Sequence, residues 1–103
     1  MLLSCVQTNV SFANISENMD RTRQWLQNAA SQGVELVVLP ECMLTGYGFE
    51  SRDEAMAQAM TIDDPRWDEL VAICRANGRM HVVVGCLEKE QTGEVASLYN
   101  ASA

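Results

Sequence analysis

The chain contains 103 residues, of which 48% are hydrophobic, and this length and composition suit one domain with an apolar core. Seven basic residues against fourteen acidic ones give a formal net charge of -7. That charge disfavours nucleic-acid binding, because phosphate backbones are repelled. No apolar run is long enough to span a membrane, and the amino-terminal stretch lacks the basic region of a signal peptide. We therefore expect a cytoplasmic protein with neither a membrane nor a nucleic-acid partner.

The four cysteines, Cys5, Cys42, Cys74 and Cys86, are widely and irregularly spaced. Zinc sites usually contain closely spaced pairs of ligands, and the chain has a single histidine, so we expect no metal site. Without a secretion signal we expect no disulfides either, and Cys5, Cys74 and Cys86 are interpreted as small buried apolar residues. The chain has no Gly-rich phosphate-binding motif. We therefore expect no cofactor.

The first predicted elements are a short strand-like run over residues 2–10 and a helix over residues 15–32. "NISE" has the form of a capping box, in which Asn14 caps the first turn and Glu17 reaches back towards it. Apolar residues then recur at helical spacing, and Gly33 is a natural stop. The pattern predicts one amphipathic helix.

The run "VELVVLP", residues 34–40, is β-branched and apolar almost throughout, which is typical of a strand covered on both faces. Pro40 ends this strand, and residues 41–50 follow as a loop. Residues 51–60 are predicted to form a short acidic helix or turn. Residues 63–78 are predicted to form a clearer helix that begins with an Asp-Pro pair.

Residues 80–88, "MHVVVGCLE", are predicted to form a second doubly buried strand. A polar turn over residues 89–94 and a last strand over residues 95–103 complete the chain. Helices that alternate with buried strands predict an α/β layered fold with right-handed crossovers.

Glu41 is the first candidate for chemistry, because function in α/β sheets gathers at the carboxyl ends of strands. A partly desolvated carboxylate there suits a general base, although ordinary loop carboxylates are common at such positions and position alone favours that interpretation. Cys42 is disfavoured as its nucleophile, because adjacent side chains point apart and the single histidine, His81, is interpreted as a core or edge residue. Tyr47 either lines a substrate pocket or packs on the sheet. Asn100, in "LYNASA", is interpreted as a hydrogen-bonding residue within a strand.

Taken in order, these stretches resemble the amino-terminal part of the nitrilase superfamily, the carbon–nitrogen hydrolases. The pairing of "LPE" with "LTGY", after a helix, is its most specific feature. The features that carry the likeness are Gln7 after the first strand, Asn18 in the first helix, "AASQGVELVVLPE" (29–41), "LTGY" (44–47), "DDPRWDELVAICRANG" (63–78), "VVVGCLE" (82–88) and "LYNASA" (98–103).

The resemblance implies a four-layer α-β-β-α sandwich. It also implies a Glu-Lys-Cys triad that hydrolyses nitriles, amides or carbamoyl compounds through a thioester. Glu41 matches the triad glutamate, the general base, whereas Cys42 does not match the nucleophile. The triad lysine of the family follows the last matched strand, and Lys89, the only lysine, lies elsewhere. We therefore interpret residues 1–103 as a single truncated domain, roughly the first third to half of such an enzyme.

A partial sandwich of one helix layer and part of one sheet would leave an apolar sheet face bare, around residues 36–39 and 82–84. We expect a homodimer or a complementary chain to cover it. One hypothesis is a hydrolase fragment or subunit that acts on small amides or nitriles and is inactive alone. The alternative is a non-catalytic self-association or partner-binding module derived from that fold. A third hypothesis is that the chain is an incomplete gene product without activity.

Overall fold

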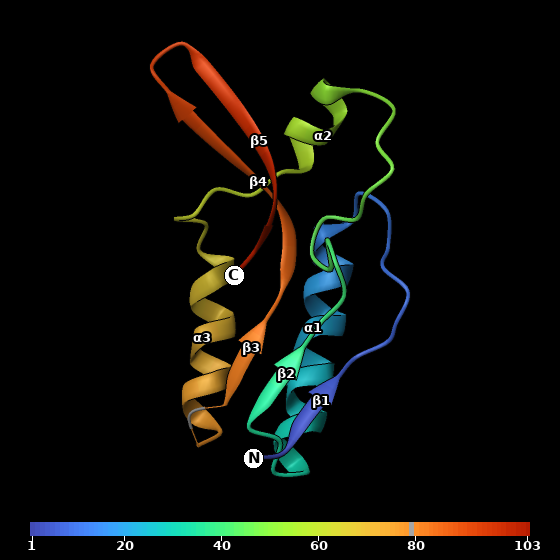
Figure 1. The fold of residues 1–103 in the computed structure, drawn as a ribbon, viewed down its shortest axis with the longest axis vertical. Coiled ribbons are helices and arrows are strands. Elements are labelled where there is room, and N and C mark those ends of the chain that lie inside the picture. Colours follow the sequence, from blue (N-terminus) through green and yellow to red (C-terminus); the bar gives the residue numbers. More distant parts are fainter. Residues whose placement is uncertain (79) are drawn as a thin grey trace.

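The structure, a computed structural model, describes residues 1–78 and 80–103 (Figure 1). In chain order the elements are β1 Leu3–Cys5, α1 Ile15–Ser31, β2 Leu36–Val38, α2 Arg52–Gln58, α3 Arg66–Ala76, β3 His81–Val83, β4 Gly85–Thr92 and β5 Val95–Ser102. None of the helices in this described part is long and apolar enough to cross a membrane. The α/β class predicted from the alternation of helices and strands is confirmed.

The strands form two separate sheets. Strands β1, β2 and β3 form a parallel sheet in that order, with Val37 beside Ser4 and Val82. Strands β4 and β5 form an antiparallel hairpin that projects beyond the sheet (Figure 1). Helices α1 and α3 lie side by side against one face of the parallel sheet (Figure 1). This arrangement corresponds to one helix layer and part of one sheet.

Helix α1 confirms the amphipathic helix predicted from the sequence. The Asn14 side chain accepts a hydrogen bond from the Glu17 backbone N–H at 3.1 Å, which satisfies one free donor of the first turn. Met19 and Leu26 are fully buried and belong to the same apolar cluster as Val37 of β2. The helix therefore covers the sheet through its apolar stripe.

The two other helices also match their predictions. Residues 51–60 contain a helix rather than only a turn, and Ser51 caps it by accepting from the Glu54 backbone N–H at 3.1 Å. At the start of α3, Asp64 accepts from the Arg66 backbone N–H at 2.9 Å, across the intervening proline. The helix thus starts at the predicted Asp-Pro pair, with Pro65 rather than Asp64 at the N-cap position.

The parallel sheet has one buried and one bare face, because successive side chains of a strand point to opposite sides. Val37 is 0% exposed under the helices, whereas Leu3 is 53% and Val83 37% exposed on the other side. The expected bare face exists, but Val37, Leu39 and Val84, which were expected on it, are buried. By register, the bare side, called here the open sheet face, consists of Leu3, Cys5, Leu36, Val38, His81 and Val83.

Three predictions about the strands are wrong. The first strand is only Leu3–Cys5. The chain then enters a loop, and the Asn18 side chain of α1 holds this loop through hydrogen bonds to the Ser11 backbone. The single strand predicted over residues 80–88 divides into β3 and β4, which pair in different sheets. The polar turn predicted over residues 89–94 is mostly strand.

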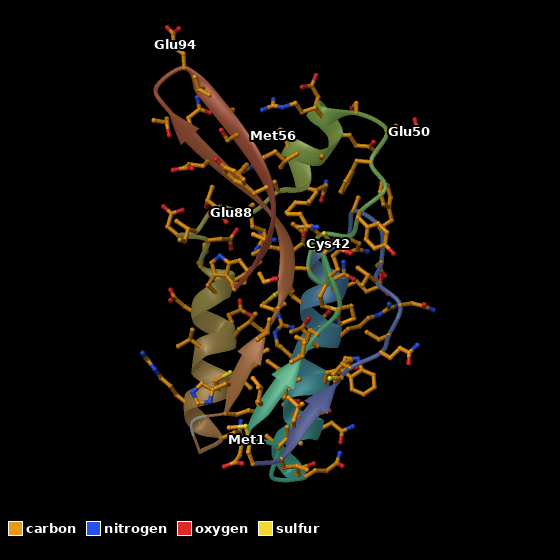
Figure 2. All side chains as sticks on the ribbon, in the orientation of Figure 1. Met1, Cys42, Glu50, Met56, Glu88 and Glu94 are labelled. Atoms are coloured by element: carbon orange, nitrogen blue, oxygen red, sulfur yellow. The ribbon has the colours of Figure 1, made fainter. Side chains whose placement is uncertain are left out.

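The hairpin explains why the polar residues 89–94 were wrongly predicted to form a turn. Strand β4 continues to Thr92, and the turn consists of Gly93 and Glu94 alone, with Gly93 at a φ of +62° that glycine adopts readily. Glu94 lies at the tip of this projecting arm (Figure 2). Polar side chains are compatible with strand structure there, because the arm is largely solvent-exposed.

Candidate active site

Glu41 stands at the carboxyl end of β2, directly after Pro40, as predicted. Its carboxylate does not stand alone, because the Asn100 side-chain amide of β5 donates a hydrogen bond to Glu41 Oε1. Glu41 is exposed to solvent in this chain, contrary to the partial desolvation expected from its position. The hydrogen bond fixes the carboxylate at the junction of the parallel sheet and the hairpin.

Asn100 is the site residue that sequence reasoning missed. Its amide nitrogen binds Glu41, and its amide oxygen accepts a hydrogen bond from the Cys42 thiol at 3.6 Å. Asn100 and Glu41 are 59 positions apart, so no local pattern joins them. The register of the hairpin, which pairs Asn100 with Leu87, brings them together.

Cys42 lies in the turn after β2 and is buried, with 1% of its surface exposed (Figure 2). Burial is the main cause of the raised pKa of the Cys42 thiol, and the neighbouring Glu41 carboxylate raises this pKa further. Hydrogen bonding with Thr45 acts in the opposite direction and lowers it. A raised pKa keeps the sulfur as an unreactive thiol at neutral pH. The structure therefore supports the interpretation of Cys42 as a bystander.

A hollow of about 370 Å³ adjoins Glu41. Tyr47, which is 66% exposed, contributes to its wall, as do residues of the loop between β1 and α1. The structure thus brings both residues predicted for the site to one hollow. The lining residues are Thr8, Asn9, Val10, Phe12, Pro40, Glu41, Gly46 and Tyr47.

One buried side chain joins the two loops that form this hollow. Asn18 Oδ1 accepts from the Ser11 backbone N–H, and Asn18 Nδ2 donates to the Ser11 carbonyl, both at 2.8 Å. The same Nδ2 donates to the Leu44 carbonyl at 3.1 Å. Asn18 is 0% exposed, and its hydrogen bonds, one buried and two part-buried, hold the loop before α1 against the loop after β2.

Gly85 allows the other close approach at the site. A Cβ atom at this position would lie 2.5 Å from the Cys42 backbone nitrogen and 3.0 Å from the Pro40 carbonyl oxygen. Only glycine therefore lets the start of β4 pass beside the turn that carries Glu41. The Leu44 backbone N–H donates to the Gly85 carbonyl at 3.2 Å, which joins the two segments.

The remaining triad functions are not assembled within the described residues. The Lys89 ammonium donates to the Met56 carbonyl at 3.2 Å, and no salt bridge joins it to Glu41. Residues 1–78 and 80–103 contain no group of three potential metal ligands. Among the described residues, the site therefore consists of the Glu41 carboxylate held by Asn100, beside the buried Cys42 thiol.

The cysteines should differ sharply in their reaction with iodoacetamide. Cys5 is exposed, contrary to the expectation that it is buried, whereas Cys86 is buried and burial raises its pKa to about 11. At pH 7.5 we expect Cys5 to be labelled at least tenfold faster than Cys42 or Cys86, because the thiolate is the reactive form. Mass spectrometry of timed samples measures the rates. Rapid labelling of Cys42 in the folded chain would make Cys42 a candidate nucleophile again.

The architecture matches part of two larger proteins of known structure. A glutamine-dependent NAD(+) synthetase from Cytophaga hutchinsonii superposes with a TM-score of 0.61 at 19% identity, covering 95% of this chain and 16% of its own. An amidase from Nesterenkonia sp. superposes with a TM-score of 0.56 at 19% identity, covering 97% of this chain and 40% of its own. This chain therefore has the fold of part of these larger proteins.

Sequence comparison agrees with the fold. The sequence model of the carbon-nitrogen hydrolase family matches residues 2–103, and the chain belongs to this family. A nitrilase from Pyrococcus abyssi is 35% identical over 98 residues, which cover 94% of this chain and 36% of the nitrilase. The chain thus spans about a third of the length of this relative, and the resemblance seen in its motifs is confirmed.

Proposed function

We propose that this chain supplies the general-base glutamate and the surrounding wall of a carbon–nitrogen hydrolase site that acts on amides or nitriles. As base, Glu41 accepts the proton that a cysteine thiol loses when its sulfur attacks the substrate carbon. The lysine and the nucleophilic cysteine come from sequence outside these residues, so the chain alone is inactive. In this proposal residues 1–103 are a truncated domain that works in the cytoplasm with a complementary chain.

One observation carries the proposal: the Glu41 carboxylate is hydrogen-bonded by Asn100 at the edge of a hollow that also contains Tyr47. A carboxylate held in one orientation at the end of a strand is prepared for proton transfer. Tyr47 offers an aromatic face and a hydroxyl to a small substrate. Family membership supports the reaction class.

The test isolates the chain from its own cells with the proteins that co-purify and measures ammonia release from small amides and nitriles. We expect Glu41→Gln to lower kcat/KM of the complex about 100-fold, the lower range for loss of a general base. Glu50→Gln is the matched control, because Glu50 is an exposed carboxylate of the same loop. The purified chain alone should release no ammonia.

Two results would contradict this proposal. Unchanged turnover of the complex after Glu41→Gln would remove Glu41 from the chemistry. Turnover by the purified chain alone, abolished by Glu41→Gln, would show that residues 1–103 contain a complete site.

The open sheet face favours a second candidate function, a non-catalytic association module. Leu3 and Val83 are both exposed on this face, and a monomer rarely leaves contiguous apolar surface of this kind uncovered. A homodimer could bury the face sheet-on-sheet. In this alternative the protein acts through self-association or partner binding, and Glu41 has no chemical task.

Sedimentation distinguishes monomer from dimer. If the open sheet face mediates dimerisation, the wild-type chain sediments as a dimer, and Val83→Lys weakens the dimer at least tenfold, because a lysine charge there would have to be desolvated. Val95→Lys is the control, since Val95 is 64% exposed on the hairpin, outside this face. A monodisperse wild-type monomer that binds no apolar dye would reject the self-association alternative.

A further inference from the structure

Cys42, directly after Glu41, has an unusual backbone for a residue with a side chain. Its φ is +50°, in the left-handed region that favours glycine, and among the described residues only Ala13 shares this feature without being glycine. Such a conformation is unfavourable for a residue with a Cβ atom, and it persists only where the surroundings impose it. Glycine would adopt it without strain. The strain at Cys42 therefore points to a contact that its side chain makes.

That contact is with the Asn100 side-chain amide. The Cys42 thiol donates to Asn100 Oδ1 at 3.6 Å, and Asn100 Nδ2 donates to Glu41 Oε1. The oxygen of a side-chain amide only accepts hydrogen bonds, and its nitrogen only donates them. The two contacts therefore use opposite ends of one amide, and together they determine which end faces Glu41.

The environment of Cys42 keeps its sulfur a donor. Cys42 is 1% exposed, and burial and the Glu41 carboxylate both raise the pKa of its thiol. A thiolate at this position could not donate to Asn100 Oδ1 and would be repelled by the Glu41 carboxylate. The same protonation that makes Cys42 a poor nucleophile thus suits it to hold the amide.

The Asn100 amide needs a second contact only when Glu41 is protonated. An ionised carboxylate accepts hydrogen bonds and donates none, so it selects the amide nitrogen by itself. A protonated Glu41 carries an O–H donor, and the amide oxygen then becomes a suitable partner as well. The Cys42 thiol opposes that reversal of the amide, because it would bring the NH₂ group against the S–H donor.

We propose that Cys42 is a positioning residue that holds the Asn100 amide with its nitrogen on Glu41 in both protonation states of Glu41. The thiol forms and breaks no covalent bond. The carboxyl group then keeps one orientation, so that Glu41 returns a proton from the same geometry in which it accepted it. This consequence for catalysis rests on the proposed function, whereas the orientation of the amide does not.

The test follows the Asn100 side-chain amide by NMR in the purified, isotope-labelled chain. Spectra are recorded at two pH values, on either side of the titration of the Glu41 carboxyl carbon. Nuclear Overhauser contacts between the NH₂ protons and the Glu41 γ-protons report where the amide nitrogen lies. We expect these contacts at both pH values in the wild type. In Cys42→Ala we expect them to be lost when Glu41 is protonated, and new contacts to form with the methyl group at position 42.

Two variants serve as controls. Cys42→Ser keeps a donor at this position, and its hydroxyl should preserve the wild-type contacts at both pH values. Cys86→Ala removes the other buried thiol, which is 2% exposed and lies on β4, and should change nothing at Asn100. Lys89 is on the same face of the hairpin as Asn100, but an ammonium keeps its charge throughout the acidic range. Circular dichroism checks that each variant is folded at both pH values.

Kinetics of the co-purified complex test the consequence for catalysis. Cys42→Ala should lower kcat about fivefold with KM unchanged, because the change affects proton transfer at Glu41 and not substrate binding. Cys42→Ser should restore kcat to within about twofold of the wild type, a result that a nucleophilic Cys42 would not give.

Loss of the wild-type contacts on protonation of Glu41 would overturn the proposal even if Cys42→Ala did not fold. Contacts that persist in folded Cys42→Ala at both pH values would also overturn it, because Glu41 would then orient the amide alone. Failure of Cys42→Ser to preserve them would show that the thiol acts by packing and not as a donor. If the NMR results are as expected but Glu41→Gln leaves turnover unchanged, the proposed function is wrong and the positioning role of Cys42 stands.

Discussion

Gly85→Ala is expected to lower the free energy of unfolding by about 3 kcal/mol, at the upper end for overpacking. The added methyl group would lie 2.5 Å from the Cys42 backbone nitrogen, and backbone atoms cannot move aside as a flexible side chain can. Either β4 or the turn that carries Glu41 must shift. Urea unfolding followed by circular dichroism measures the stability, and Gly85→Val should cost more than Gly85→Ala.

Gly78→Ala provides the contrast. Gly78 has a φ of +71°, which disfavours alanine, but no atom lies within 4 Å of the added Cβ. The expected cost is only the backbone term of about 1 kcal/mol. If the two substitutions cost the same, the close approach of β4 to the Glu41 turn does not exist in solution. A Gly85→Ala variant of wild-type stability would lead to the same conclusion.

The sequence was most informative where local rules decide the structure. Asn14 and Glu17 identified the start of α1 because a capping interaction acts over only three positions. The β-branched run before Pro40 identified β2, since a strand buried in a parallel sheet needs apolar side chains throughout. The position of Glu41 at the end of that strand followed directly.

Prediction failed where contacts between distant segments decide. Glu88 and Lys89 were separated into a strand and a turn, although pairing with β5 makes both of them strand. The division of residues 80–88 at Val84 arises because β3 pairs with β2 and β4 pairs with β5, and neither partner is readable from that segment. Asn100 was interpreted only as a hydrogen-bonding residue of a strand for the same reason, because its role as donor to Glu41 depends on the hairpin register.

The candidate site is therefore a junction of three segments rather than a motif. The turn after β2 carries Glu41, β5 carries its hydrogen-bond donor Asn100, and the loop before α1 forms the opposite wall of the hollow. Each segment is attached to a rigid element, which favours a fixed geometry for a proton acceptor. Disturbing the attachment of any one loop should alter the hollow without touching Glu41.

Asn18→Ala is expected to destabilise the chain by about 3–4 kcal/mol, because a fully buried side chain loses three hydrogen bonds together and their partners keep their desolvation cost. The Ser11 N–H, the Ser11 carbonyl and the Leu44 carbonyl would each lose a partner, and Asn18 is fully buried. Asn28→Ala is the control, since Asn28 is exposed and its side chain accepts a hydrogen bond from the Gln32 side chain. That change should cost less than about 0.5 kcal/mol.

Asn18→Asp separates packing from hydrogen bonding, because the carboxyl group has nearly the shape of the amide. An ionised carboxylate would face the Ser11 and Leu44 carbonyl oxygens in a buried position, so burial and repulsion favour its protonated form and raise its pKa on folding. The folded state then binds more protons than the unfolded state, and stability relative to wild type falls as pH rises above about 4, the usual Asp value. Urea unfolding at pH 4 and pH 7 measures this difference. Equal stability deficits at both pH values would mean that residue 18 faces water and that Asn18 does not hold the two loops of the Glu41 hollow together.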